Sequence, residues 1–135
     1  MRISARVENG KGRHHVTLTT NGQSHALSIA PKAEGRGSSA NGGELLALAL
    51  ATCYCNDVYR EAAARGIAVR GVRVEVDTEF GAAGEPARRI RYRATVDADA
   101  PEDAVRALIE HTDRVAEVHN TLRAGIAVEL ERANA

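Results

Sequence analysis

The chain has 135 residues, no net charge at pH 7 and 44% hydrophobic residues, a composition that fits one domain with a core of its own. The balanced charge and the absence of a basic block argue against a nucleic-acid surface, and no apolar stretch reaches the roughly 18 residues that span a bilayer. The first ten residues alternate charged and apolar side chains without a following apolar segment, so we expect no signal peptide, a cytosolic protein and no structural disulfide.

The first thirty residues alternate between apolar and polar side chains, as β-strands do. Ile3, Ala5 and Val7 alternate with polar neighbours, and the runs "HHVTLTT" and "SHALSIA" flank Asn21 and Gly22. An Asn-Gly pair between two β-prone runs predicts a hairpin, because both residues tolerate a positive φ.

Residues 31–43, "PKAEGRGSSANGG", form a loop rich in glycine and serine. Loops of this length are often functional, and a plain surface loop fits the composition equally well. The Walker lysine is missing from "GRGSSANGG", so a phosphate-binding loop is not indicated.

A long helix is predicted from about residue 42 to 65. Asn41 is suited to the N-cap, Glu44 stands where a capping box has its acid, and Gly66 provides a stop. The run "LLALALATCYC" is apolar around the whole helical circumference, which indicates a central helix with neighbours on all sides.

The second half of the chain predicts two strands, a helix and a final strand. Residues 72–76 and 90–96 alternate apolar and polar side chains on either side of "GAAGEP". A second helix is expected from Pro101 to about residue 118, followed by a strand over "GIAVELE". The resulting order is βββ-α-ββ-α-β, an α+β pattern, and without a repeat or linker we expect one domain over residues 1–135.

The two cysteines, Cys53 and Cys55, lie on the predicted long helix. Successive helical residues are rotated by about 100°, so the two thiols point about 160° apart and suit neither a mutual disulfide nor one metal ion. Cys55 shares the face of Val58 and Ala62 and is expected in the core, whereas Cys53 lies where the apolar stripe meets polar residues. Cys53 is therefore the candidate functional thiol.

The pKa of a reactive thiol must be lowered by a positive charge. Asp57, four residues after Cys53, would instead raise it. The cation must therefore come from Arg60 or from an arginine on a strand or loop.

Five histidines raise the question of a metal site. His14 and His15 would point to opposite faces of a strand, and His111 and His119 are about two helical turns apart, which is too far for one ion. We expect neither a metal nor a cofactor.

Three segments resemble the OsmC/Ohr family, the osmotically induced and organic hydroperoxide resistance proteins. The segment "GELLALALATCYCNDVYREAAARGI" resembles the family's central helix, with an acidic residue and Leu-Leu before a reactive cysteine. "GIAVRGVRVEVDTEF" looks like the strand that follows, and "VHNTLRAGIAVEL" is similar to the C-terminal helix-to-strand passage.

The resemblance implies an intertwined homodimer in which the central helices pack together and the active sites lie at the interface. It implies reduction of organic hydroperoxides by a peroxidatic thiolate, for which Cys53 takes the matching position. In the family an arginine lowers the pKa of that thiol and a glutamate holds the arginine. Arg13, in "GKGRHH", matches the arginine best, Arg36 is the alternative, and Glu44 lies one position from the family's glutamate.

The family's second, resolving cysteine has no counterpart in this chain. Ala116 and Glu117 stand where many relatives have Cys-Pro, and Cys55 faces away from Cys53 on the same helix. The resemblance therefore implies a one-cysteine cycle regenerated by an external thiol reductant.

Three functions fit these features. In the first, Cys53 reduces an organic hydroperoxide held in an aliphatic pocket at the dimer interface, with Arg13 or Arg36 and Glu44 assisting, and His119 lining the pocket. In the second, the same fold is a non-catalytic module that binds an apolar small molecule at the interface. In the third, the protein is a purely structural dimer. No membrane or nucleic acid is expected as a partner.

Overall fold

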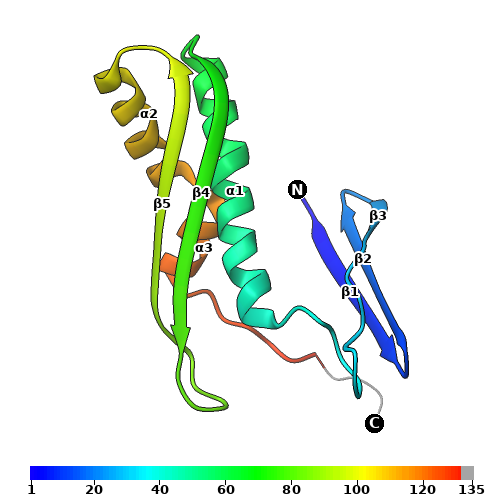
Figure 1. The fold of residues 1–135 in the computed structure, drawn as a ribbon. Coiled ribbons are helices and arrows are strands. Elements are labelled where there is room, and N and C mark those ends of the chain that lie inside the picture. The colour runs from blue at the N-terminus through cyan, green and yellow to red at the C-terminus, as the bar shows by residue number, and fades with distance from the viewer. Residues whose placement is uncertain (132–135) are drawn as a thin grey trace. The chain divides into compact units, whose positions relative to one another are not determined.

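The computed structural model describes residues 1–131 and has an α+β fold, as the sequence predicts (Figure 1). Its elements in chain order are β1 (Ile3–Gly10), β2 (Arg13–Thr20), β3 (Gln23–Leu27), α1 (Gly42–Ala64), β4 (Ala68–Phe80), β5 (Ala87–Asp99), α2 (Glu102–Val115) and α3 (Glu117–Ala124). The chain divides into two compact units, one up to Leu45 and the other from Leu46 onward. That both belong to one domain stays a prediction.

The first unit contains an antiparallel sheet in the order β1-β2-β3. The predicted hairpin at Asn21 and Gly22 is confirmed, with φ angles of 49° and 81°. Asn21 also accepts a 2.9 Å hydrogen bond from the backbone N–H of Arg2. In the glycine-rich loop between β3 and α1, the backbone N–H of Gly37 donates a hydrogen bond to the side chain of Asn9. This bond ties the loop to β1.

The ends of α1 form as the sequence predicts. The Asn41 side chain accepts a 2.8 Å hydrogen bond from the N–H of Glu44, and the Glu44 carboxylate accepts a 2.9 Å bond from the N–H of Asn41. At the other end Gly66 has φ 67°, and the N–H of Ile67 bonds back to the carbonyl of Ala62. A capping box and a left-handed glycine thus delimit the helix.

Within the second unit, the described residues cover one face of α1. The buried residues on it are Leu50, Tyr54, Asp57, Val58 and Ala62. On other faces Leu48 is 54% exposed and Tyr59 is 44% exposed. The sequence predicts neighbours on all sides of this helix, and the described residues of the second unit do not supply them.

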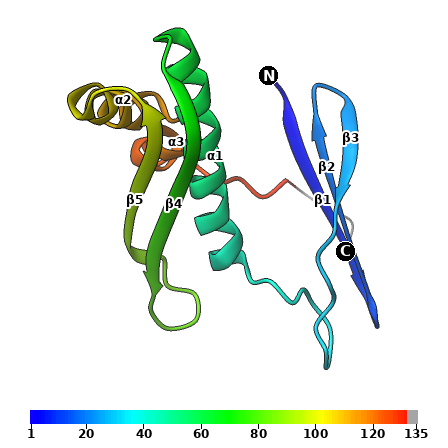
Figure 2. The ribbon, with the colours of Figure 1, turned by 45° about the horizontal axis from the view of Figure 1, so that its top comes forward.

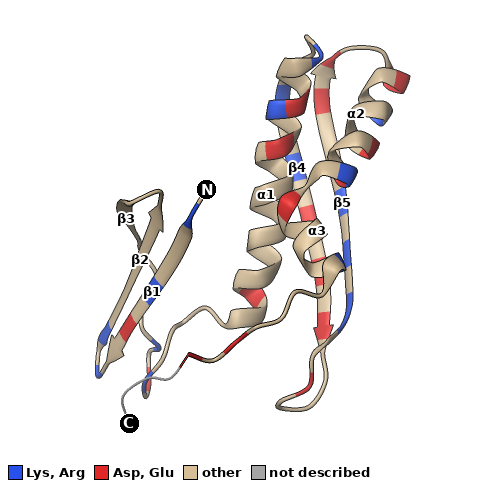
Figure 3. Cartoon of the chain, turned by 180° about the vertical axis from the view of Figure 1, so that it is seen from behind, with Lys and Arg blue, Asp and Glu red and all other residues tan. Residues whose placement is uncertain are grey.

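The second unit has two layers, a β4-β5 hairpin and the three helices. Figure 2 shows the long hairpin, and Figure 3, from behind, shows α1, α2 and α3 in front of it. The register pairs Val72 with Val96 and Val74 with Ala94, so apolar side chains from both strands share one face. The core that the two layers enclose consists of Tyr54, Val58, Ala62, Leu108 and Ala116, with partly buried strand residues packed against it.

Two predictions for the C-terminal part are wrong. The helix expected up to about residue 118 ends at Val115, Ala116 is extended with ψ 111°, and α3 follows. The side chains of Asn120 and Arg123 hydrogen-bond to carbonyl oxygens at the end of α2, which replaces the bonds that helix continuation would supply.

The strand expected over residues 125–131 does not form within the described residues. Its alternating pattern is present, but a strand needs a partner for its backbone groups, and no described strand pairs with it. Ile126, Val128 and Leu130 are consequently 70%, 99% and 97% exposed.

No helix among residues 1–131 is both long and apolar enough to cross a bilayer.

Candidate functional site

Cys53 lies in the middle of α1, half-buried at the edge of the face that packs on the core. Its neighbour Tyr54 is completely buried and donates a 2.7 Å hydrogen bond to the carbonyl of Ile109 on α2, which fixes the rotation of α1. The Cys53 thiol is consequently directed away from the centre of the core, toward the polar residues that follow on α1 and those at the start of α3.

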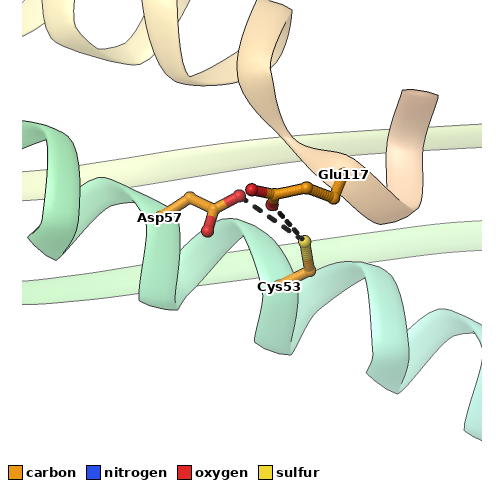
Figure 4. A group of neighbouring side chains, drawn as sticks. All are labelled: Cys53, Asp57 and Glu117. Atoms are coloured by element: carbon orange, nitrogen blue, oxygen red, sulfur yellow. Dashed lines mark hydrogen bonds between the residues drawn. The ribbon is translucent and has the colours of Figure 1, made fainter. Parts of the chain in front are cut away.

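Two carboxyl groups face the sulfur atom (Figure 4). The Cys53 Sγ lies 3.5 Å from Asp57 Oδ2 and 3.8 Å from Glu117 Oε2, distances at which a thiol donates a hydrogen bond. Asp57 is one helical turn beyond Cys53, so the two side chains stack on the same face of α1. Glu117 comes from the first turn of α3, where the extended Ala116 redirects the chain.

Arg60 bridges the two carboxyl groups through the oxygens that do not face the sulfur. Its Nη1 lies 3.0 Å from Asp57 Oδ1 and 3.0 Å from Glu117 Oε1. Each carboxyl therefore turns one oxygen to the thiol of Cys53 and the other to the guanidinium. Figure 3 shows that the charged residues of α1 gather in its C-terminal half, apart from one acid at its start.

The surroundings favour the neutral thiol of Cys53 over its thiolate. Burial raises the pKa of Cys53 most strongly, and the negative charges of Asp57 and Glu117 raise it further. The backbone N–H of Val118, in the first turn of α3, hydrogen-bonds to the sulfur and lowers the pKa in part. The sequence-based prediction that Asp57 opposes ionisation of this thiol is confirmed.

The two carboxyl groups are coupled to each other. Burial raises the pKa of Asp57, and a hydrogen bond with Glu117 and the charge of Glu117 raise it further. The pKa of Glu117 is lowered, first by its own backbone N–H in α3 and then by the bond with Asp57. The two shifts are opposite in direction, so Asp57 ionises less readily than Glu117.

These three side chains have the atoms of a small metal site. The Cys53 sulfur and one oxygen each from Asp57 and Glu117 lie within 4.8 Å of one another. However, Arg60 already bridges both carboxyl groups, and a metal ion would have to compete with its guanidinium. Arg60 is itself held by Glu61, with 3.0 Å between Nε and Oε2.

Cys55 is also a free, half-buried thiol. It lines a shallow hollow of about 270 Å³ together with Ala51, Thr52, Asn56 and Val74. None of the groups around Cys53 is among these residues, in keeping with the predicted separation of the two thiols around α1.

His119 is buried with both ring nitrogens unpartnered in the described residues. Its ring packs against Tyr92, with 4.6 Å between ring centroids, and against Tyr54, at 5.8 Å. Burial lowers its pKa, which favours the neutral imidazole. His119 lines a cavity of about 350 Å³ whose walls include Leu50 and Leu122, and its place in the active pocket stays a prediction. Cys53 is not among the residues that line this cavity.

The comparison with protein families agrees with the geometry. The family model described as OsmC-like protein matches residues 35–131. The chain belongs to the OsmC-like family. No curated protein sequence matches it at a significant level.

Solved structures of OsmC-like proteins share the fold. An OsmC-like protein from Mycoplasma pneumoniae is 18% identical with a TM-score of 0.65, and the match covers 90% of this chain and 86% of that one. An organic hydroperoxide resistance protein from Elizabethkingia anophelis is 20% identical with a TM-score of 0.61, covering 91% and 89%. An organic hydroperoxide resistance protein OsmC from Legionella pneumophila is 20% identical with a TM-score of 0.54, covering 91% and 90%.

Three residues that the family resemblance implicates lie in the first unit of this OsmC-like chain. Arg13 opens β2 and Arg36 belongs to the glycine-rich loop, and both are exposed. Glu44 is engaged in the capping box of α1. Within residues 1–131 neither arginine forms an ion pair with Glu44, and their roles toward Cys53 stay predictions.

Glu117 is the site residue whose contact with Cys53 sequence reasoning missed. Glu117 is 64 residues from Cys53 in the chain. The sequence predicts one continuous helix through this position, and so it does not predict the extended Ala116 that directs Glu117 to the sulfur. The one available signal was its place in the segment where the family resemblance implies Cys-Pro in many relatives. Asp57 and Arg60 are recognisable from helical spacing alone.

Proposed function

We propose that this OsmC-like protein reduces organic hydroperoxides through Cys53 in a one-cysteine cycle. The observation that carries the proposal is the thiol itself: it lies half-buried on the central helix, beside two carboxyl groups and a backbone N–H. The names of two structural relatives, organic hydroperoxide resistance proteins, agree with this chemistry.

The cycle uses one protein thiol and two external ones. Cys53 sulfur attacks the terminal peroxide oxygen, the O–O bond breaks, and the products are a Cys53 sulfenic acid and an alcohol. One external thiol then forms a mixed disulfide with release of water, and a second external thiol restores Cys53. This route suits a chain in which Ala116 replaces the resolving cysteine of many relatives.

A cation from outside the second unit is part of the proposal. Arg60, the cation beside the site, is held by Asp57 and Glu117, and burial together with these two carboxyl groups raises the pKa of Cys53. We assign the activating role to Arg13, with Arg36 as the alternative, and the positioning of that arginine to Glu44.

A second copy of the chain is the partner that we propose, as the family resemblance implies. The uncovered face of α1 bears the exposed Leu48, and the alternating apolar residues Ile126, Val128 and Leu130 have no strand partner within residues 1–131. Pairing two chains would cover both surfaces. The hydroperoxide would then bind at the interface, beside Cys53.

The experiment that tests this function is sulfenic-acid trapping. Reduced protein is exposed briefly to cumene hydroperoxide or, separately, to hydrogen peroxide, and trapped peptides are identified by mass spectrometry. Rapid labelling of Cys53, faster with the organic peroxide, is expected in the wild type and in Cys55→Ser, and none in Cys53→Ser. Labelling of Cys53 no faster than that of a free cysteine would refute a peroxidase function.

One observation favours the alternative, a non-catalytic module that binds an apolar small molecule. The 350 Å³ cavity beside His119 is large enough for a small ligand and has apolar walls at Leu50 and Leu122. In that case native mass spectrometry of the purified protein would detect a bound ligand that Leu122→Arg abolishes, and Cys53 would show no accelerated oxidation.

A further inference from the structure

The feature that the one-cysteine cycle leaves unexplained is the carboxyl pair. A peroxidatic thiol is expected among cations, yet Cys53 faces Asp57 on α1 and Glu117 on α3, and Arg60 holds both. Asp57 is buried, at 5% exposure, and a buried carboxyl group is costly unless it is paired, as Asp57 is with Arg60. The second oxygen of each carboxyl group faces the sulfur.

We propose that Asp57 and Glu117 are the acid–base pair for the reaction at Cys53: Glu117 accepts the thiol proton, and the pair delivers that proton to the leaving alkoxide. This inference rests on the proposed reduction of hydroperoxides. It assigns a general acid and a general base to side chains that the resemblance to OsmC-like proteins does not implicate.

The geometry suits these roles. Glu117 accepts a hydrogen bond from the Cys53 thiol through Oε2, and the thiol proton can move along this contact. Asp57 accepts from the same thiol at 3.5 Å and is buried, so water does not take its place. Arg60 bridges Oδ1 and Oε1, which leaves Oδ2 and Oε2 free to face the reaction.

Protons and electrons balance without another reactant. The thiol proton passes to Glu117 while the sulfur gives an electron pair to the terminal oxygen of the hydroperoxide. The S–O bond forms, the O–O bond breaks, and the alkoxide takes the transferred proton from the carboxyl pair to leave as an alcohol. Sulfur is oxidised, the peroxide is reduced, and both carboxyl groups return to their starting protonation.

Other charged groups near the pair lie one contact further out. Glu61 bonds to Arg60 Nε, and His111 Nε2 lies 2.7 Å from Glu61 Oε1. The N–H of Val118 reaches the sulfur but holds a backbone proton that does not titrate. Among the described residues, the groups that both titrate and bond to the sulfur are therefore Asp57 and Glu117.

The test compares two reactions of Cys53 in the variant Glu117→Gln. Alkylation by iodoacetamide needs only the thiolate, and removing an anion should favour the thiolate, so this rate is expected to rise about threefold or more at pH 7. Sulfenic-acid formation with cumene hydroperoxide needs the proton acceptor, so this rate is expected to fall about a hundredfold. Opposite changes in the two rates are the signature of acid–base participation.

Three further variants sharpen the comparison. Asp57→Asn should also separate the two rates, and Glu117→Asp, which keeps a carboxylate, should recover part of the peroxide reaction. Glu102→Gln removes an exposed charge at the start of α2, far along the chain from the site, and should change neither rate. Circular dichroism establishes that each variant is folded before its rates are compared.

The outcomes separate this inference from the function on which it rests. If the wild type reacts with cumene hydroperoxide and both rates rise together in Glu117→Gln, the pair only disfavours the Cys53 thiolate through its negative charge. The inference is then overturned. If the wild type does not react faster than a free thiol, the peroxidase function fails, and the acid–base assignment fails with it.

Discussion

Replacing Leu108 by alanine removes the most deeply buried aliphatic side chain of α2. Leu108 has no exposed surface and belongs to the core cluster with Tyr54 and Val58 of α1 and with Ala116. The hydroxyl of Thr112, also fully buried, bonds back to the carbonyl of Leu108 and holds this turn of α2 in place. The site is therefore enclosed by groups that cannot easily move to fill a void.

The expected loss in the free energy of unfolding follows from this enclosed position. Leu→Ala substitutions in protein cores cost about 2–5 kcal/mol, and rigid surroundings place the cost in the upper part of the range. We expect the free energy of unfolding to fall by about 3–4 kcal/mol. At about 4–8 °C per kcal/mol for a unit of this size, the Tm should fall by at least about 12 °C.

The assay is urea denaturation followed by circular dichroism at one fixed protein concentration, with Arg106→Ala as the control. Arg106 lies two residues earlier on α2, its side chain is 63% exposed and its contact is a 3.4 Å ion pair with Glu102. The control should change the free energy of unfolding by no more than about 0.5 kcal/mol. A loss below about 1 kcal/mol in Leu108→Ala, or an equal loss in both variants, would refute the packing described for α2.

Three further predictions concern the site, the end of α1 and the oligomeric state. Because the folded-state pKa of Asp57 is raised above 3.8, this carboxyl group should contribute a loss of stability as the pH rises from 3.8 through the raised value. The free energy of unfolding of the wild type should therefore fall relative to that of Asp57→Asn over this range in urea titrations, and identical pH slopes would contradict the raised pKa. Gly66→Ala should cost about 1 kcal/mol in unfolding free energy because Gly66 has φ 67°, and Gly66→Asn should cost less. Leu48→Glu should raise the dissociation constant of the proposed dimer at least about tenfold, because it places a charge on an exposed apolar face. Light scattering after gel filtration measures this change, and an unchanged dimer would exclude this face from the interface.

The local signals in the sequence were enough for most of the fold. The Asn21-Gly22 turn, the capping box of Asn41 and Glu44, and the stop at Gly66 each depend on a few adjacent residues, and the structure confirms all three. The strands β4 and β5 follow from their alternation because one face of the hairpin is buried under helices.

The two failures share a cause, which is dependence on residues far along the chain. Nothing local marks Ala116 as a break, since alanine is a strong helix former; the break is stabilised by side chains of α3 that bond to the end of α2. The segment 125–131 has the pattern of a strand, but a pattern cannot supply the partner.

In the candidate site, too, the residues close to Cys53 in the sequence could be predicted and the distant one could not. Helical spacing from Cys53 identifies Asp57 and indicates Arg60 as its neighbour, because both lie on one helix. Glu117 approaches from another helix, and that approach depends on the unpredicted break at Ala116. The roles of Arg13, Arg36 and Glu44 rest on the family resemblance and stay predictions.

The tyrosines beneath the site also give the protein an optical property. The chain has three tyrosines and no tryptophan, so tyrosine dominates its near-ultraviolet spectrum. Tyr54 and Tyr92 stack edge to face 4.9 Å apart in the core, and burial raises the pKa of Tyr54 to about 12 and that of Tyr92 above its ordinary value as well. Tyrosinate absorbance from these two residues near pH 10 would thus report an opened core, which gives each variant of Cys53, Asp57 or Glu117 a label-free optical check of the packing beside the thiol.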